Sequence, residues 1–223
     1  MYKRNVQFPG PKNTAIVWRY MTFVGFVDLL QRRKLFFSRL EKLVDPYEGF
    51  YSPEIMPVLE SKVPKAVIRA AEKFSRRNYC VNCWHENEGE SAAMWAIYSN
   101  SDGIAIRSTV KRLKYALKNE ERNVFIARVH YDPATAPAAS PLVYKRKSFE
   151  HEKEIRMWCL EADRKKRQAK GTYASVDLGV LMEAVFVSPT AGPWVKQVIQ
   201  STLDLHRLGI KAVQSKLFSK SLV

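Results

Sequence analysis

Charged side chains alternate along residues 150–156, which read EHEKEIR. Glu150, Glu152 and Glu154 stand at every second position, and Arg156 continues the spacing. A β-strand would turn all four side chains to one face, whereas a helix would align only Glu150 with Glu154. Packing such a face is costly unless it lines a wet or functional cleft. The stretch therefore predicts a carboxylate site suited to acid–base chemistry, metal coordination or ribose binding.

The alternative for these glutamates is a set of salt bridges at a surface rim. Basic residues surround the stretch and could pair with it. They are Lys145, Arg146, Lys147 and Arg156.

The run CVNCWH supplies a second candidate site. Cys80 and Cys83 are spaced to hold zinc, with His85 as a third ligand. The fourth ligand would come from Cys159, His151 or His130. A strand, however, turns Cys80 and Cys83 to opposite faces, and no second CxxC is present, so we expect structural thiols and no bound metal. Cys83 and His85 could also form a nucleophile–base pair, although no orienting partner is evident.

The chain is strongly basic, with 37 Lys and Arg against 22 Asp and Glu and a formal net charge of +15. This excess suggests a polyanionic partner, nucleic acid above all, or a basic surface that serves solubility only. Two basic runs are the predicted nucleic-acid-binding residues. They are Lys145, Arg146 and Lys147, and then Arg164, Lys165, Lys166 and Arg167.

Size and composition indicate one globular domain over residues 1–223, because no linker is visible and hydrophobic residues make up 46% of the chain. Three cysteines do not make a disulfide framework, so we expect a reducing, cytoplasmic location. The first residues lack the apolar run of a secretory signal, and no stretch is apolar enough for a membrane helix. No membrane partner is therefore expected.

No GxxxxGK[ST] or GxGxxG motif occurs, which disfavours Walker-type and Rossmann nucleotide sites.

Hydrophobic periodicity predicts an α+β protein with one twisted mixed sheet and flanking helices, because strands and helices do not alternate regularly. The expected strands cover residues 14–21, 34–38, 79–85, 103–109, 123–132, 152–160, 180–189 and 210–217. The expected helices cover residues 23–34, 65–77, 110–119 and 191–209, with a short one at 147–152. A further helix should start at Glu90 or Ser91 and bury Met94, Trp95 and Tyr98. Thr109 is expected to cap a helix, and Gly209 to end one.

Four separated segments carry a family resemblance. They are VWRYMTFVGFVDLLQRRKLFFS, LVDPYEGFY, YCVNCWHENEGESAAMWAIYSNSDGIAIRST and KRKSFEHEKEIRM. Together they resemble the bacterial family catalogued as "domain of unknown function 2971". The family-like core covers about residues 14–160, and a closing strand–helix–strand at about 178–217 fits the family's tail. That family has no established activity.

A more distant likeness is to the ADP-ribosyltransferase fold, in which a first strand carries Arg or His and a late strand carries Glu-x-Glu. Arg19 in VWRY would take the first position, and Glu152 and Glu154 the last, with Glu154 aligned to the catalytic carboxylate. The central strand of that fold carries Ser-Thr-Ser, for which Cys83 and His85 would have to substitute here.

The likeness implies NAD as a cofactor. Arg19 would bind a phosphate, Glu154 would stabilise positive charge on the ribose, and Glu152 would orient the acceptor nucleophile. Trp95 and Tyr98 would pack against the nicotinamide. We therefore expect an ADP-ribosyltransferase-like enzyme that modifies a nucleic acid or a protein, as a toxin or in phage defence. The alternative is a noncatalytic, basic nucleic-acid-binding module.

Overall fold

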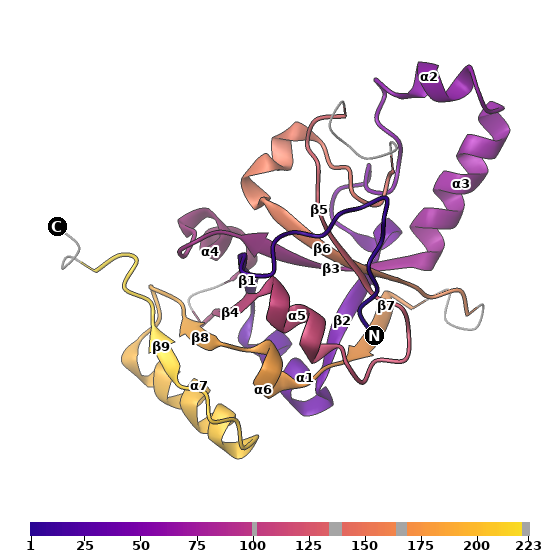
Figure 1. Ribbon diagram of the computed structural model, residues 1–223. Helices are drawn as coiled ribbons and strands as arrows, with labels where there is room; N and C mark the ends of the chain where they lie inside the picture. Colours follow the sequence, from indigo (N-terminus) through magenta and orange to yellow (C-terminus); the bar gives the residue numbers. More distant parts are fainter. Residues whose placement is uncertain (100–101, 134–139, 164–168, 220–223) are drawn as a thin grey trace. The chain divides into compact units, whose positions relative to one another are not determined.

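The computed structural model describes residues 1–99, 102–133, 140–163 and 169–219 (Figure 1). Its strands form a single twisted, mixed sheet with flanking helices, as the sequence predicts. The chain divides into two compact units. Unit 1 comprises Met1–Pro11, Phe36–Cys83 and Glu121–Ala174, and unit 2 comprises Lys12–Leu35, Trp84–Glu120 and Ser175–Val223. Neither unit is continuous in the sequence, which explains why no linker is visible. One domain over residues 1–223 stays a prediction.

Unit 1 contains the strand order β5-β6-β3-β2-β7. These strands are β2 (Lys34–Arg39), β3 (Tyr79–Glu86), β5 (Phe125–Arg128), β6 (Glu154–Leu160) and β7 (Gly171–Ser175). β2 pairs antiparallel with β3, and β5 pairs antiparallel with β6. The helices are α2 (Met56–Glu60) and α3 (Lys65–Asn78), with 3-10 turns η1 (Leu40–Lys42) and η3 (Lys147–Glu152). A core around Trp158, Leu40 and Val143 supports this end of the sheet.

In unit 2, the order of strands across the sheet is the last part of β3, followed by β1-β4-β8-β9. The strands are β1 (Ile16–Met21), β4 (Ile104–Thr109), β8 (Ala184–Val187) and β9 (Ala212–Gln214). The pairs β3–β1, β1–β4 and β4–β8 are antiparallel, and β9 runs parallel to β8. The helices are α1 (Phe23–Arg32), α4 (Ala92–Tyr98), α5 (Val110–Ala116), α6 (Leu178–Leu181) and α7 (Pro193–Leu205).

One face of β1 is covered by α4. Trp18 and Tyr20 pack against Met94 and Trp95 of α4. Arg19, between them, must point to the other face because strand side chains alternate.

Most predicted elements are confirmed, and the caps explain where several helices begin. The Ser91 and Thr109 side chains accept hydrogen bonds from the backbone N–H of Met94 and Arg112, which fixes the starts of α4 and α5. Within the described residues, no helix has the length and apolar character needed to cross a membrane.

Three expectations are wrong in detail, and one strand was not expected. Tyr98 is 41% exposed instead of buried, because α4 packs mainly through Met94 and Trp95. α7 ends at Leu205, before Gly209, and the left-handed residue there is Arg207. The strand expected over 180–189 is split between α6 and the shorter β8. Strand β7 was not predicted at all.

Candidate functional site

The alternating glutamates do not lie on one strand. Glu150 and Glu152 belong to the 3-10 turn η3, and Lys153 adopts a left-handed conformation with φ of 40° before β6 begins at Glu154. The prediction of a shared strand face therefore fails for Glu150 and Glu152. It is confirmed for Glu154 and Arg156, which are two residues apart on β6.

Arg156 is the centre of a buried ionic network in unit 1, and none of its surface is exposed. Its Nε donates to Glu154 Oε1 at 2.6 Å, and its Nη2 donates to Glu154 Oε2 at 3.0 Å. Nη1 and Nη2 also donate to the two carboxylate oxygens of Glu48, at 3.0 and 3.1 Å. Nη1 donates further to the carbonyl oxygen of Leu142 at 3.0 Å. All five guanidinium N–H groups thus have an acceptor.

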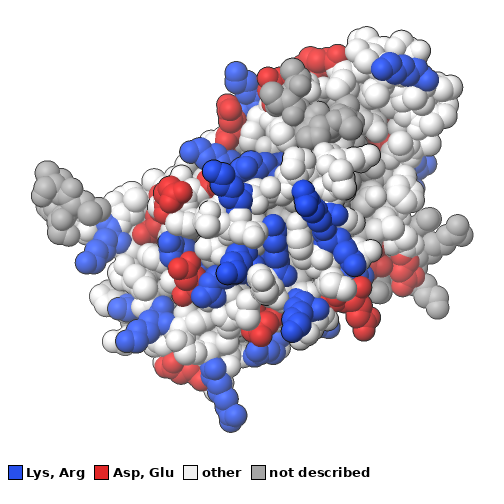
Figure 2. Space-filling view, viewed as in Figure 1, with Lys and Arg blue, Asp and Glu red and all other residues white. Residues whose placement is uncertain are grey.

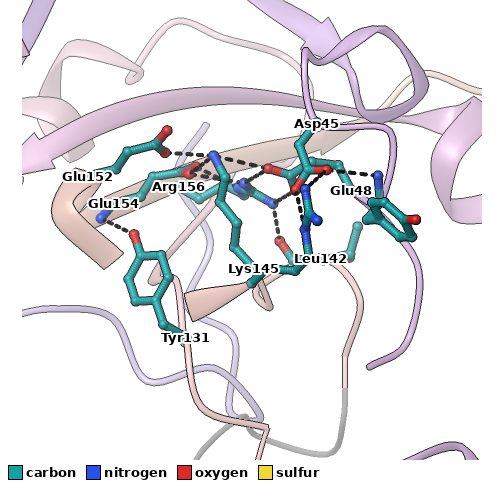
Figure 3. Close-up of polar contacts among 10 residues, drawn as sticks. Asp45, Glu48, Tyr131, Leu142, Lys145, Glu152, Glu154 and Arg156 are labelled. Atoms are coloured by element: carbon teal, nitrogen blue, oxygen red, sulfur yellow. Dashed lines mark hydrogen bonds and ion pairs between the residues drawn. The ribbon is translucent and has the colours of Figure 1, made fainter. Parts of the chain in front are cut away.

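Lys145 connects Glu152 to the two carboxylates that bind Arg156, Glu48 and Glu154 (Figure 3). Its Nζ lies 2.6 Å from Glu152 Oε2, 3.2 Å from Glu48 Oε1 and 3.6 Å from Glu154 Oε2. The Lys145 side chain is only 9% exposed. Glu152 and Glu154 therefore meet at one ammonium group even though they belong to different elements.

The network is an interior structure and not a surface rim. Glu48, Glu152 and Glu154 are all buried, and these three carboxylates share two cations, Lys145 and Arg156. The expected salt bridges of Lys145 and Arg156 are present, but their expected location at a rim is wrong. Removing either cation would leave buried carboxylates without a compensating charge, which is strongly destabilising.

The protonation states follow from this arrangement. Burial alone would raise the pKa of Glu154, but the Arg156 guanidinium outweighs it and lowers that pKa to about 2. Burial lowers the pKa of Lys145, but Glu154 and Glu48 more than offset it, so that pKa is raised. Burial, together with the Glu154 carboxylate, raises the pKa of Cys83 well above its usual value. At neutral pH the site therefore holds a carboxylate, an ammonium and a protonated thiol.

Asp45 and Glu48 are site residues that were not predicted, because no regular spacing connects them to the glutamates of residues 150–154. They lie in the loop LVDPYEGFY, whose sequence indicated only a family resemblance. Asp45 Oδ1 accepts from Arg146 Nη2 at 2.7 Å, so this loop is attached to the residues before β6 at two points. The segments LVDPYEGFY and KRKSFEHEKEIRM therefore meet in one network.

The predicted nicotinamide-binding residues, Trp95 and Tyr98, lie in unit 2, as does His85, which was predicted to bind the cofactor. His85 and Trp95 are buried, with ring centroids 6.2 and 5.0 Å from that of Tyr20. Trp95 Nε1 donates to Glu90 Oε2 at 3.0 Å. Trp95 is therefore part of the packed aromatic core on one face of β1, while Tyr98 is half-exposed.

Arg19 is not brought together with this aromatic group, because it points to the other face of β1. In register it lies opposite Ile106 of β4, whereas Tyr20 lies opposite Ala105 in the aromatic cluster. Arg19 belongs to unit 2 and Glu154 to unit 1. A cleft shared by Arg19 and Glu154 stays a prediction.

The cysteines are free thiols. Cys80 is buried, and burial raises its pKa to about 11. Cys83 interacts with Glu154, whereas His85 packs beside Tyr20. Across the described ranges, no group of three or more His, Cys, Asp or Glu side chains is arranged to hold a metal ion.

The predicted nucleic-acid-binding residues have different environments. Lys145 is buried among carboxylates, so a phosphate group would have to compete with them. Arg146 is 44% exposed but pairs with Asp45 and stacks over Tyr47 at 4.4 Å. Lys147 is exposed. Arg164, Lys165, Lys166 and Arg167 lie outside the described residues.

Helix α5 carries a basic face that was not predicted, because its lysines are separated by other residues in the sequence. Lys111, Lys114, Tyr115 and Lys118 are spaced i, i+3, i+4 and i+7, so they project from one side of the helix and its C-terminal end. The opposite side is buried through Val110, Leu113 and Ala116. Figure 2 shows Lys and Arg side chains gathered over α5.

Comparisons with protein-family models, curated proteins and solved structures find no match to this chain. Membership of the "domain of unknown function 2971" family and the ADP-ribosyltransferase-like fold therefore stay predictions.

Proposed function

We propose that the protein is a nucleic-acid-binding module that contacts a single strand through the exposed face of α5. The observation that carries this proposal is the combination of three lysines and an exposed tyrosine on one helix face. Residues 110–119 contain four basic residues and no acidic one. A polyanion would therefore meet no like charge from this helix.

The lysines are available to a ligand to different degrees. Lys111 and Lys118 are exposed, and their side-chain ammonium groups have no hydrogen-bond or ion-pair partner within the described part of the chain. Lys114 is half-buried and donates to the side chain of Asn13 at 2.8 Å. Lys12 is also exposed, and its neighbour Asn13 accepts a hydrogen bond from the backbone N–H of Lys111. The positive surface thus extends from α5 to Lys12.

Tyr115 favours a single strand over a duplex. It is 61% exposed and stands between Lys111 and Lys118 on the helix face. An unpaired base can stack on such a ring while the lysines neutralise the flanking phosphates. A duplex keeps its bases stacked on one another and would leave the ring unused.

The ADP-ribosyltransferase hypothesis has less geometric support. Its central carboxylate, Glu154, is 3% exposed, and both of its oxygens accept from Arg156. A ribose hydroxyl would have to displace one of these charge-assisted hydrogen bonds. This arrangement favours a structural role for Glu154.

The experiment is a fluorescence-anisotropy titration of a labelled 20-nucleotide single strand. The variant Lys111→Gln/Lys114→Gln/Lys118→Gln should bind at least tenfold more weakly than the wild type, because three phosphate contacts are lost. The matched control, Lys42→Gln/Lys62→Gln/Lys65→Gln, removes the same charge from exposed positions of unit 1. Equal weakening of both variants would show that net charge alone drives binding and would contradict the proposal.

A further inference from the structure

A second basic surface lies in unit 1, in a groove between α3 and the loop at residues 41–50. Its volume is about 410 Å³, within the range of small-ligand sites. Four cations line it: Arg69, Lys73, Arg76 and Arg77. They are spaced i, i+4, i+7 and i+8 on α3 and therefore lie along one side of the helix.

The loop holds one end of this groove in a fixed shape. Arg76 Nη1 donates to the carbonyl oxygen of Pro46 at 2.9 Å, and its guanidinium lies 4.0 Å from the ring centroid of Phe50. Gly49 has a φ of +80°, and a Cβ there would come within 2.6 Å of Arg76 Cγ. Glycine is thus required for the close approach of the loop to α3.

Two of the four cations remain available. Arg69 and Lys73 are exposed, and their cationic side-chain groups have no hydrogen-bond or ion-pair partner within the described ranges. Arg77 Nε, in contrast, lies 3.9 Å from a carboxylate oxygen of Glu41. An anion entering the groove would therefore be bound first by Arg69 and Lys73.

The groove also contains hydrogen-bond acceptors. Glu41 and Glu72 line it together with Phe50. Glu72 is buried and accepts from the backbone N–H of Tyr51 at 3.1 Å, which fixes its carboxylate in place. A bare anion would be repelled by these carboxylates, whereas a ligand that carries hydroxyl donors beside its anionic group would satisfy both kinds of residue.

We propose that this groove binds a nucleoside 5′-monophosphate. The phosphate would lie at Arg69 and Lys73, the ribose hydroxyls would donate to Glu41 and Glu72, and the base would contact the exposed part of the Phe50 ring. The ligand is either a free nucleotide or the 5′-terminal nucleotide of a strand, since both present the same groups. This inference does not depend on α5.

The experiment is isothermal titration calorimetry with adenosine 5′-monophosphate, adenosine and inorganic phosphate at low salt. We expect the nucleotide to bind at least tenfold more tightly than either fragment. Arg69→Gln/Lys73→Gln should weaken nucleotide binding at least tenfold, whereas the control Lys62→Gln/Lys65→Gln should not. A 5′-phosphorylated dinucleotide that binds as tightly as the free nucleotide would identify strand ends as a source, and weaker binding would identify the free nucleotide.

Three results would overturn the inference: no heat of binding, nucleotide affinity unchanged in Arg69→Gln/Lys73→Gln, or inorganic phosphate binding as tightly as the nucleotide. The α5 lysine variant should bind the nucleotide like the wild type. Failure of this inference is therefore distinguishable from failure of the proposed function.

Discussion

Arg156 and Glu154 form a bidentate ion pair in the interior of unit 1, at 2.6 and 3.0 Å. The other side of the same guanidinium binds both carboxylate oxygens of Glu48. Arg156 therefore connects β6 to the loop that contains Asp45 and Glu48. This connection gives the glutamate-rich stretch a structural explanation.

Replacing Glu154 by Gln should destabilise the protein. The substitution removes one of the two carboxylates that bind a fully buried guanidinium, while Glu48 still compensates its charge. We therefore expect the loss of charge-assisted hydrogen bonds, about 1.5–3 kcal/mol, and not the cost of a fully unpaired buried charge. Urea denaturation followed by circular dichroism would measure the loss of unfolding free energy. Glu150→Gln is the matched control, because Glu150 is exposed, and it should change stability by less than about 0.5 kcal/mol. Comparable stabilities for the two variants would refute a structural role for Glu154.

Stability should decrease in acid because the pKa of Glu154 is lowered to about 2 from an ordinary value of 4.5. A carboxyl group with a lowered pKa contributes its full stabilisation above the unfolded value and loses it as the pH falls through the folded value. The unfolding free energy should thus decline between about pH 4.5 and pH 2. Urea titrations at several pH values would show a smaller decline for Glu154→Gln than for the wild type. Parallel declines would assign the acid sensitivity to other groups.

The thiols of Cys80 and Cys83 should be unreactive in the folded protein. Their pKa values are raised, mainly by burial, so few thiolates form near pH 8. Ellman's reagent should react slowly with the native protein and rapidly with all three cysteines in guanidinium chloride. Rapid native labelling of Cys83, located by mass spectrometry, would revive the nucleophile hypothesis.

Tyr115→Ala should weaken single-strand binding while leaving the charge unchanged. Stacking of one base on an aromatic ring contributes about 1–3 kcal/mol, so the affinity should fall by about fivefold to about 160-fold. Tyr115→Phe keeps the ring and should bind like the wild type. If anisotropy titrations give the same affinity for Tyr115→Ala and Tyr115→Phe, the ring does not contact a base.

Local signals predicted most of the fold. Thr109 and Ser91 mark helix starts because their side chains cap the next turn, and β-branched runs such as TAIVW identify strands. The end of α7 was not predictable in this way, because Arg207, and not Gly209, adopts the left-handed conformation. Strand β7 was missed because GTYAS is short and follows a run of basic residues in the sequence. Its position depends on pairing with β2, which is distant in the sequence.

The sequence identified Glu152, Glu154 and Lys145 but not their environment. Period-two spacing suggested a strand, but the left-handed Lys153 places Glu152 in a 3-10 turn. Asp45 and Glu48 could not be assigned to the site, since their partners are about a hundred residues away. The α5 lysines were predictable from their helical spacing, but they do not form a run of consecutive basic residues in the sequence.

The salt dependence of single-strand binding tests the central claim most directly. For single strands, the logarithm of the binding constant falls with the logarithm of salt concentration by about 0.7 per neutralised phosphate. Removing Lys111, Lys114 and Lys118 should therefore make the slope shallower by about 2, while the Lys42/Lys62/Lys65 control keeps the wild-type slope. Equal slopes for the wild type and the α5 variant would contradict a nucleic-acid-binding face on α5.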